Sequence, residues 1–185
     1  MVWNTPFSQF VRGEITLGKT WIMGRKGGQS VAARLVGGAG YAYGNSNALP
    51  FEKHFYAGGS NSLRGWQART VGPGHSPMDT TFVIPNQTGD MKLEANIEYR
   101  FDMFWKVAGA VFADAGNVWT LKADSSEEGQ ESLFRWQDFG KSIAANWGVG
   151  LRLDFGFLLL RVDMGIKIHD PAREQPWVNP GQWLN

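Results

Sequence analysis

Residues 91–102 alternate between apolar and polar side chains without an exception, and this alternation constrains the fold more than any other feature of the sequence. Every odd position is apolar, from Met91 to Phe101, and every even position is polar, from Lys92 to Asp102. Successive side chains of a β-strand point to opposite faces, whereas a helix would spread these charges around its whole circumference. The segment is therefore predicted to be a strand with one apolar face and one polar face.

The same period recurs along the chain and predicts an all-β protein. The expected strands cover residues 7–20, 30–43, 91–102, 105–115, 146–155 and 157–169. Most of these ranges are longer than the mode of ~5–6 residues in globular proteins. They are close to the ~9–11 residues that a tilted strand needs to cross a bilayer.

The two faces of these strands favour a transmembrane barrel over a soluble sandwich. The polar face mixes opposite charges with glycines, as at Gly148, Gly150 and Arg152, which suits a crowded, wet lumen. Aromatic side chains such as Trp105 and Trp119 flank the apolar face, where membrane interfaces select them. On pattern alone, a sandwich or lipocalin remains the alternative. Single-chain membrane barrels are closed and start at about eight strands, so about six strands predict an antiparallel up-and-down transmembrane β-barrel that is only partial.

The composition excludes several other classes of protein. The chain has 185 residues and no cysteine, which rules out a disulfide framework and thiolate metal sites. Its 18 basic and 17 acidic residues leave a net charge of +1, so no nucleic acid partner is expected.

No catalytic residue, metal site or cofactor is expected either. The three histidines lack metal-ligand spacing; they are His54, His75 and His169. Ser60 lacks the second glycine of a nucleophile elbow. Residues 37–40, Gly-Gly-Ala-Gly, lie within an alternating strand, where they indicate close backbone packing rather than a phosphate loop.

Two connections between the expected strands are long. Residues 120–141 begin with a hydrophilic run and are expected to form an external loop. Residues 44–89 exceed the ~15 residues beyond which a loop in a compact domain is usually functional or disordered. This second loop includes Phe55, Leu63 and Trp66 and is too apolar for simple disorder, so we expect it to fold back onto other parts of the chain.

The centre of this long loop reads Phe-Tyr-Ala-Gly-Gly-Ser-Asn-Ser-Leu-Arg-Gly-Trp over residues 55–66. It resembles the sixth extracellular loop of the BamA/TamA-type outer-membrane assembly factors, the bacterial surface antigen family, in which a Gly-Gly segment leads to Val/Ile-Arg-Gly-Phe/Tyr. The matching positions are Gly58, Gly59, Leu63, Arg64, Gly65 and Trp66. Residues 96–101 resemble the strand that follows this loop in the family. Residues 112–119, which include Asp114 and Gly116, resemble the Phe-x-Asp-x-Gly motif of the next strand.

The resemblance implies that the loop dips into the lumen, where acidic side chains of neighbouring strands hold its arginine. By matching motifs, Arg64 is the loop-lock residue, and its partners in the lumen are Glu98 and Asp114. Alternation independently places both carboxylates on the polar face of their strands. A guanidinium can engage carboxylates through two parallel hydrogen bonds, so such a contact is chemically well suited to hold the loop.

The resemblance also implies a location and a function. The chain would be the C-terminal part of an outer-membrane β-barrel, without the periplasmic repeats, the first barrel strands or the last strand of the family. It would lie in the outer membrane of a Gram-negative bacterium and assemble and insert other β-barrel proteins. The implied partners are outer-membrane lipid, unfolded outer-membrane protein clients, and accessory assembly subunits that contact the absent periplasmic part.

Two other functions stay open. The two-partner secretion transporters of the same superfamily share the loop motif but export a polypeptide through the pore. The number of periplasmic repeats in the parent gene would separate them from assembly factors. A soluble ligand-binding β-domain is the other alternative, and a monodisperse monomer without detergent would favour it over a membrane protein.

Overall fold

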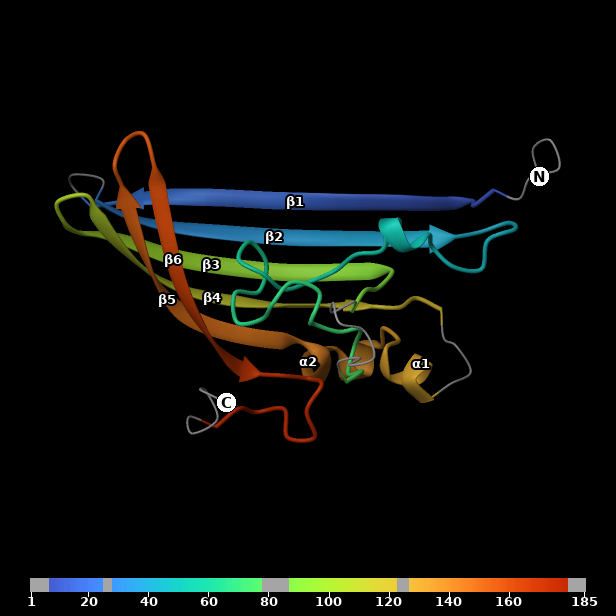
Figure 1. Cartoon of the computed structure of the whole chain (residues 1–185). Coiled ribbons are helices and arrows are strands. Elements are labelled where there is room, and N and C mark those ends of the chain that lie inside the picture. Colours follow the sequence, from blue (N-terminus) through green and yellow to red (C-terminus); the bar gives the residue numbers. More distant parts are fainter. Residues whose placement is uncertain (1–6, 25–27, 78–86, 123–126, 180–185) are drawn as a thin grey trace.

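The computed structural model describes residues 7–24, 28–77, 87–122 and 127–179 and is built around one antiparallel sheet (Figure 1). Its strands are β1 (Phe10–Met23), β2 (Gln29–Ala42), β3 (Met91–Phe104), β4 (Val107–Trp119), β5 (Ala144–Asp154) and β6 (Leu159–His169). They are hydrogen-bonded in the order β1-β2-β3-β4-β5-β6, so each strand pairs with its neighbours in sequence. The sheet is open, which agrees with a partial up-and-down barrel. None of the helices in the described ranges has the length and apolarity needed to span a bilayer.

Each strand overlaps one of the ranges expected from alternation, and β1 and β4 differ most from their expected bounds. Strand β1 lies three residues further along the chain at both ends than the expected 7–20. Strand β4 differs from the expected 105–115 at both ends. It begins at Val107 rather than at residue 105, because Trp105 and Lys106 form the tight turn that joins it to β3. Trp105 has a φ of 52° and is exposed, so it is a turn residue rather than the first residue of the strand. At the other end, β4 continues to Trp119, which pairs with Met91.

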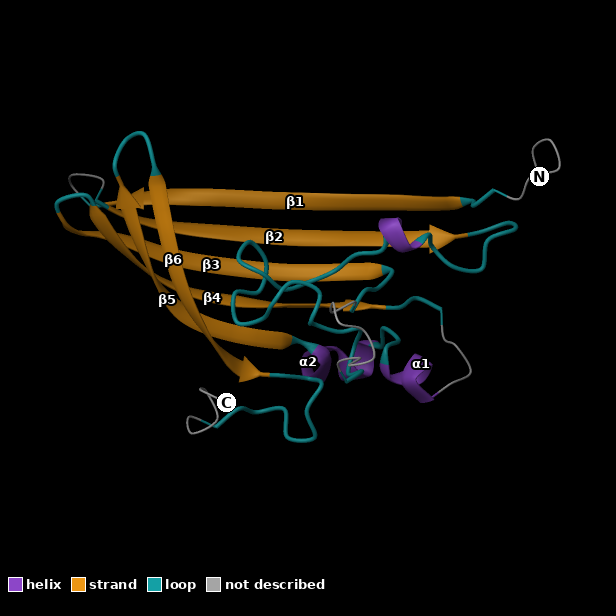
Figure 2. Cartoon of the chain, in the orientation of Figure 1, coloured by secondary structure: helices purple, strands orange, loops and turns teal. Residues whose placement is uncertain are grey.

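The connections at the two ends of the sheet differ in length (Figure 2). At one end, the connections between β1 and β2, β3 and β4, and β5 and β6 are only two to five residues long. At the other end lie the long connections over residues 43–90 and 120–143, together with every short helix of the described chain. This asymmetry is that of outer-membrane barrels, which have short periplasmic turns and longer extracellular loops.

The outer face of the sheet is apolar and exposed. One side chain in two along every strand contributes to it, as the alternation predicts. Its exposed members include Val11, Ile15, Leu17, Trp21, Leu35, Ile97, Tyr99, Val111, Val149, Leu151, Leu160, Val162 and Met164. A continuous apolar surface of this kind suits lipid, whereas soluble proteins rarely expose one.

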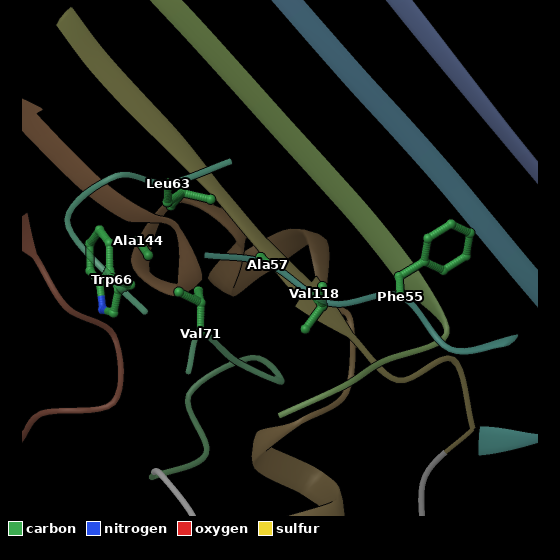
Figure 3. Packing of buried hydrophobic residues seen from close by; sticks show 7 residues of the cluster. All are labelled: Phe55, Ala57, Leu63, Trp66, Val71, Val118 and Ala144. Carbon is green, nitrogen blue, oxygen red and sulfur yellow. The ribbon is translucent and has the colours of Figure 1, made fainter. Parts of the chain in front are cut away.

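The hydrophobic core lies between the long loop and the inner face of the sheet. Of the seven residues in the buried cluster, five belong to the loop: Phe55, Ala57, Leu63, Trp66 and Val71. The other two are Val118 of β4 and Ala144 of β5 (Figure 3). The loop therefore does fold back onto the chain, and it covers part of the inner face of the sheet (Figure 1).

Gly38 and Gly40 make room for this loop. An added Cβ at Gly38 would lie 2.6 Å from the ring of Phe55, and one at Gly40 would lie 2.7 Å from Leu49. These two glycines therefore allow the loop to pack closely against β2, as their place in a strand suggests.

Residues 120–141 are less simple than the hydrophilic loop expected from the sequence. They contain α1 (Glu127–Glu131), the 3₁₀ turn η2 (Trp136–Asp138) and most of α2 (Phe139–Ser142). Trp119, Phe134, Trp136 and Phe139 form a second aromatic cluster, with ring centroids 5.1–6.0 Å apart. The indole N–H of Trp119 also donates to Ser142 Oγ at 3.0 Å. Aromatic packing organises this segment. The hydrophilic run at residues 124–128 gave no indication of it.

Candidate functional site

A row of polar side chains crosses the inner face of the sheet at one level. Arg34 pairs in register with Asn96, Asn96 with Asp114, Asp114 with Asn146, and Asn146 with Lys167. Four of these side chains are linked directly: Arg34 Nε donates to Asn96 Oδ1 at 2.9 Å, Asn96 donates to Asp114 Oδ1 at 2.9 Å, and Asn146 donates to Asp114 Oδ2 at 3.0 Å. Two side chains of the sheet therefore donate to the two oxygens of Asp114, in addition to any contact from the loop.

The adjacent row supplies space beside this carboxylate. In register it contains Glu98, Phe112, Gly148 and Gly165. At this level of β5 and β6, the two glycines contribute no side chain to the inner face. A Cβ at Gly165 would lie only 2.7 Å from the carbonyl oxygen of Arg64, so the loop backbone rests directly on β6.

Arg64 lies in the place that the two rows create, which we call the arginine seat and define as Glu98, Phe112 and Asp114. Its Nε donates to Asp114 Oδ2 at 3.0 Å, and its Nη2 donates to Asp114 Oδ1 at 2.8 Å. The backbone N–H of Arg64 also donates to Asp114 Oδ2 at 3.1 Å, and its Nη1 donates to Glu98 Oε2. The guanidinium lies over the ring of Phe112, 3.5 Å from the centroid.

Both ions of the bidentate pair are withdrawn from water. The side chain of Arg64 is 8% exposed and that of Asp114 is 0% exposed. Burial alone would lower the pKa of Arg64, but hydrogen bonds to Asp114 and Glu98 outweigh it and raise this pKa above its ordinary value. Arg64 is therefore a permanent cation. Buried pairs are costly to break because the remaining charge stays desolvated.

A wider network of ion pairs surrounds the arginine seat. Glu98 accepts from Arg100 Nε at 2.7 Å and from Arg152 Nη2 at 3.0 Å. Arg152 also donates to Asp163 Oδ1 at 2.5 Å, and Asp163 Oδ2 lies 3.9 Å from Arg64 Nη1. Charges from β3, β5 and β6 therefore alternate around the loop arginine.

The structure places the remaining motif residues in packing roles. Leu63 is fully buried, and Trp66 is 7% exposed with Lys167 Nζ 5.0 Å from its ring centroid. Gly65 lies against Asn146, where an added Cβ would meet the Asn146 Cβ at 2.8 Å. All three residues contact other parts of the protein.

The three motif glycines occupy backbone positions that a side chain would disturb. Gly58 and Gly59 have φ values of 96° and 95°, a region that L-residues rarely adopt. Gly116 faces β3, where a Cβ would lie 2.9 Å from the Cα of Glu94. The first two glycines thus allow the chain to turn into the loop tip, and Gly116 allows close packing.

Sequence reasoning assigned no role to Phe112 or Asp163. Phe112 stood on the inward side of its strand in the alternation, and an apolar residue on a polar face is the signal that could have singled it out. Asp163 also stood on the polar face of β6, but nothing in its local sequence distinguishes it from other luminal charges. Only the register of β6 brings it near Arg64.

Phe112→Leu is expected to lower the free energy of unfolding by about 1–2 kcal/mol, because it removes a buried cation–π contact and part of the packing. Urea titration in detergent, followed by the fluorescence of the nine tryptophans, measures this change. The matched control is Phe104→Leu, since Phe104 is 68% exposed at the end of β3. Equal effects of the two substitutions would show that the ring contributes nothing specific to Arg64.

Within the described ranges, no three histidine, cysteine, aspartate or glutamate side chains are grouped so as to hold a metal ion. His54 lies 3.3 Å from Thr88 Oγ1, and His169 Nδ1 lies 2.7 Å from the carbonyl oxygen of Ile143. His54 and His169 therefore contact different parts of the protein.

Comparisons with known proteins identify a family and a similar fold. The Omp85 superfamily domain matches residues 7–177. The outer membrane protein assembly factor BamA of Neisseria meningitidis serogroup B is 36% identical over 92 residues, which are 47% of this chain and 11% of that protein. A crystal structure of BamA from Haemophilus ducreyi lacking POTRA domains 1–3 superposes with a TM-score of 0.67 at 18% identity. That match covers 86% of this chain and 32% of the other, so the chain spans only a minor part of the relatives it matches.

Proposed function

Because the chain belongs to the Omp85 superfamily and lies in the bacterial outer membrane, we propose that it takes part in assembling and inserting β-barrel proteins in that membrane. The relative from Neisseria meningitidis is named as an outer membrane protein assembly factor, and this chain spans 11% of it. The activity proposed here is therefore that of the complete gene product, to which this chain contributes part of the barrel. Its proposed partners are outer-membrane lipid, unfolded outer-membrane protein clients and accessory subunits.

The observation on which this proposal most depends is the seating of the long loop inside the sheet. Arg64 is held by Asp114 and Glu98 on the inner face, as the resemblance to assembly factors implies. We propose that this arginine holds the loop in the lumen and keeps β3 to β6 in the arrangement needed for activity. The role is mechanical, and no covalent step is proposed.

The proposed mechanism uses backbone hydrogen bonding. An edge strand presents unpaired N–H and C=O groups that can template a client strand. In the complete gene product, the template would be such an edge at a weakened seam of the barrel. Lipid contacts the apolar outer face, and a belt that is locally short would thin the bilayer beside it. A client hairpin would then meet both a template and a lower barrier to insertion.

The test uses the complete gene product reconstituted in liposomes and an unfolded eight-stranded outer-membrane client. We expect the client to become protease-protected and heat-modifiable in the membrane faster than in empty liposomes. The seat variant Arg64→Ala is expected to reduce this rate, whereas Arg173→Ala is expected to leave it unchanged. Arg173 is a suitable control because it forms an ion pair with Asp170, outside the arginine seat.

The two-partner secretion transporters remain the second candidate, since they share the loop motif. In the same liposomes, a transporter would deliver its polypeptide to the enclosed volume in soluble form. Recovery of the client there, rather than in the membrane, would contradict the assembly function and favour export.

A further inference from the structure

The tip of the long loop, Ser60 and Asn61, lies between two arginines from opposite flanks of the sheet. Arg34 of β2 donates through Nη2 to the carbonyl oxygen of Asn61. Arg161 of β6 donates through Nη2 to the carbonyl oxygen of Ser60 at 2.7 Å and to Asn61 Oδ1 at 3.1 Å. Strands β3, β4 and β5 lie between β2 and β6, so the tip bridges strands that do not pair with each other.

Each of these arginines is also fixed on the sheet. Arg34 donates to Asn96 Oδ1 through Nε at 2.9 Å and through Nη2 at 2.8 Å. Arg161 Nε lies 3.1 Å from Asp163 Oδ2. The two side chains are therefore oriented toward the loop tip by residues of the strands, and they are not free to follow the tip if it moves.

The tip contacts differ from the arginine seat in their exposure to water. The side chains of Arg34 and Arg161 are 36% and 37% exposed, against 8% for Arg64. They line a hollow of about 410 Å³ with Ser60 and Asn61, and because Arg64 and Glu98 border the same hollow, the difference lies in the exposure of the side chains themselves. Water can replace a hydrogen bond at an exposed site far more cheaply than at a buried one. The tip contacts are thus the weaker of the two attachments.

The local backbone separates the tip from the seat. Ser62 N–H donates to the Gly59 carbonyl at 3.0 Å, and Trp66 N–H donates to the Leu63 carbonyl at 3.1 Å, so two successive turns are formed. The first turn contains the tip and the second contains Arg64. Gly58 and Gly59, both with positive φ, precede the first turn and provide backbone freedom there.

We propose that Arg34 and Arg161 are positioning residues that form a second, separable attachment of the loop, and that the loop leaves the sheet in two steps. In the first step the tip is released from β2 and β6 while Arg64 stays in its seat. In the second step the seat itself opens. This inference concerns the attachment of the loop and does not depend on which client the protein handles or on the assembly function itself.

The test places a nitroxide label at the tip. The chain has no cysteine, so Ser60→Cys provides a unique labelling site in this part of the complete protein, and the side chain of Ser60 is exposed. In this background we expect Arg34→Gln or Arg161→Gln to raise the ratio of mobile to immobile label roughly fivefold, and the double variant roughly thirtyfold. Trypsin cleavage after Arg64 is expected to stay as slow as in the parent.

The matched control is Arg173→Gln. The Arg173 side chain is 37% exposed and pairs with a carboxylate, as that of Arg161 does, but it does not contact the loop tip. The control is expected to leave the label spectrum unchanged. An immobile label in both Arg34→Gln and Arg161→Gln would overturn the proposal. Cleavage after Arg64 that accelerates together with label mobility would also overturn it, because the two attachments would then open as one.

Discussion

Arg64→Ala is expected to expel the long loop from the sheet and to lower the free energy of unfolding by about 3–5 kcal/mol. The substitution removes the bidentate partner of Asp114, whose side chain is fully buried, and one of the cations around Glu98. If the loop stayed in place, both carboxylates would be desolvated with fewer donors, and this cost favours release of the loop. Unfolding in urea measures the loss, and limited proteolysis of residues 55–66 measures the exposure of the loop.

The control for this prediction is Arg173→Ala, which removes an exposed ion pair of the kind worth about 0–1 kcal/mol. Arg64→Lys is expected to be intermediate, because a lysine keeps the charge but cannot form two parallel bonds to one carboxylate. Unchanged proteolytic protection and heat stability in Arg64→Ala would show that the arginine does not hold the loop.

Gly165→Val is expected to have an effect of similar size while leaving every charge in place. An added Cβ at this position would lie 2.7 Å from the carbonyl oxygen of Arg64 and 2.8 Å from the backbone nitrogen of Gly65. Both neighbours are backbone atoms and cannot move without lifting the loop. Overpacking costs about 1–3 kcal/mol, and loss of the Arg64 contacts adds to it. Faster trypsin cleavage after Arg64 is the expected measurement.

Gly18→Val provides the comparison for the glycine prediction. Gly18 also lies within a strand, and its nearest neighbour for an added Cβ is the carbonyl oxygen of Ala33 at 4.0 Å. This substitution is therefore expected to leave loop protection unchanged. If Gly165→Val resisted trypsin as well as Gly18→Val, the close contact between β6 and the loop would not determine the position of Arg64.

Alternation in the sequence was sufficient to predict the strands and the inward direction of Glu98 and Asp114, because side-chain direction in a strand depends only on local position. The burial of Arg64 in the arginine seat could not be predicted in this way. It depends on Phe112 and Gly165 meeting in one lateral row, which only the strand register determines. Sequence spacing cannot reveal such a row without knowing the length of the intervening connections.

The segment at residues 120–141 shows a second limit of sequence reasoning. Its helices have three to five residues, too few for a helical period to be recognised. Trp119 and Phe139 come together through the path of the chain, and their separation in sequence gives no sign of it. The turn at Trp105 is similar, since a tryptophan with positive φ has no turn signal of its own.

The position of the long loop in the chain affects the order in which the protein can fold. Arg64 is 50 residues before Asp114, and Ser60 is 101 residues before Arg161, so the loop is synthesised before the strands that hold it. Contacts over such separations form late because the chain must first lose the corresponding entropy. We therefore expect β3 to β6 to pair around an unfilled interior, and the residues that form most of the core to enter last. Any factor that receives this chain during its own biogenesis meets a sheet whose core residues are still outside it.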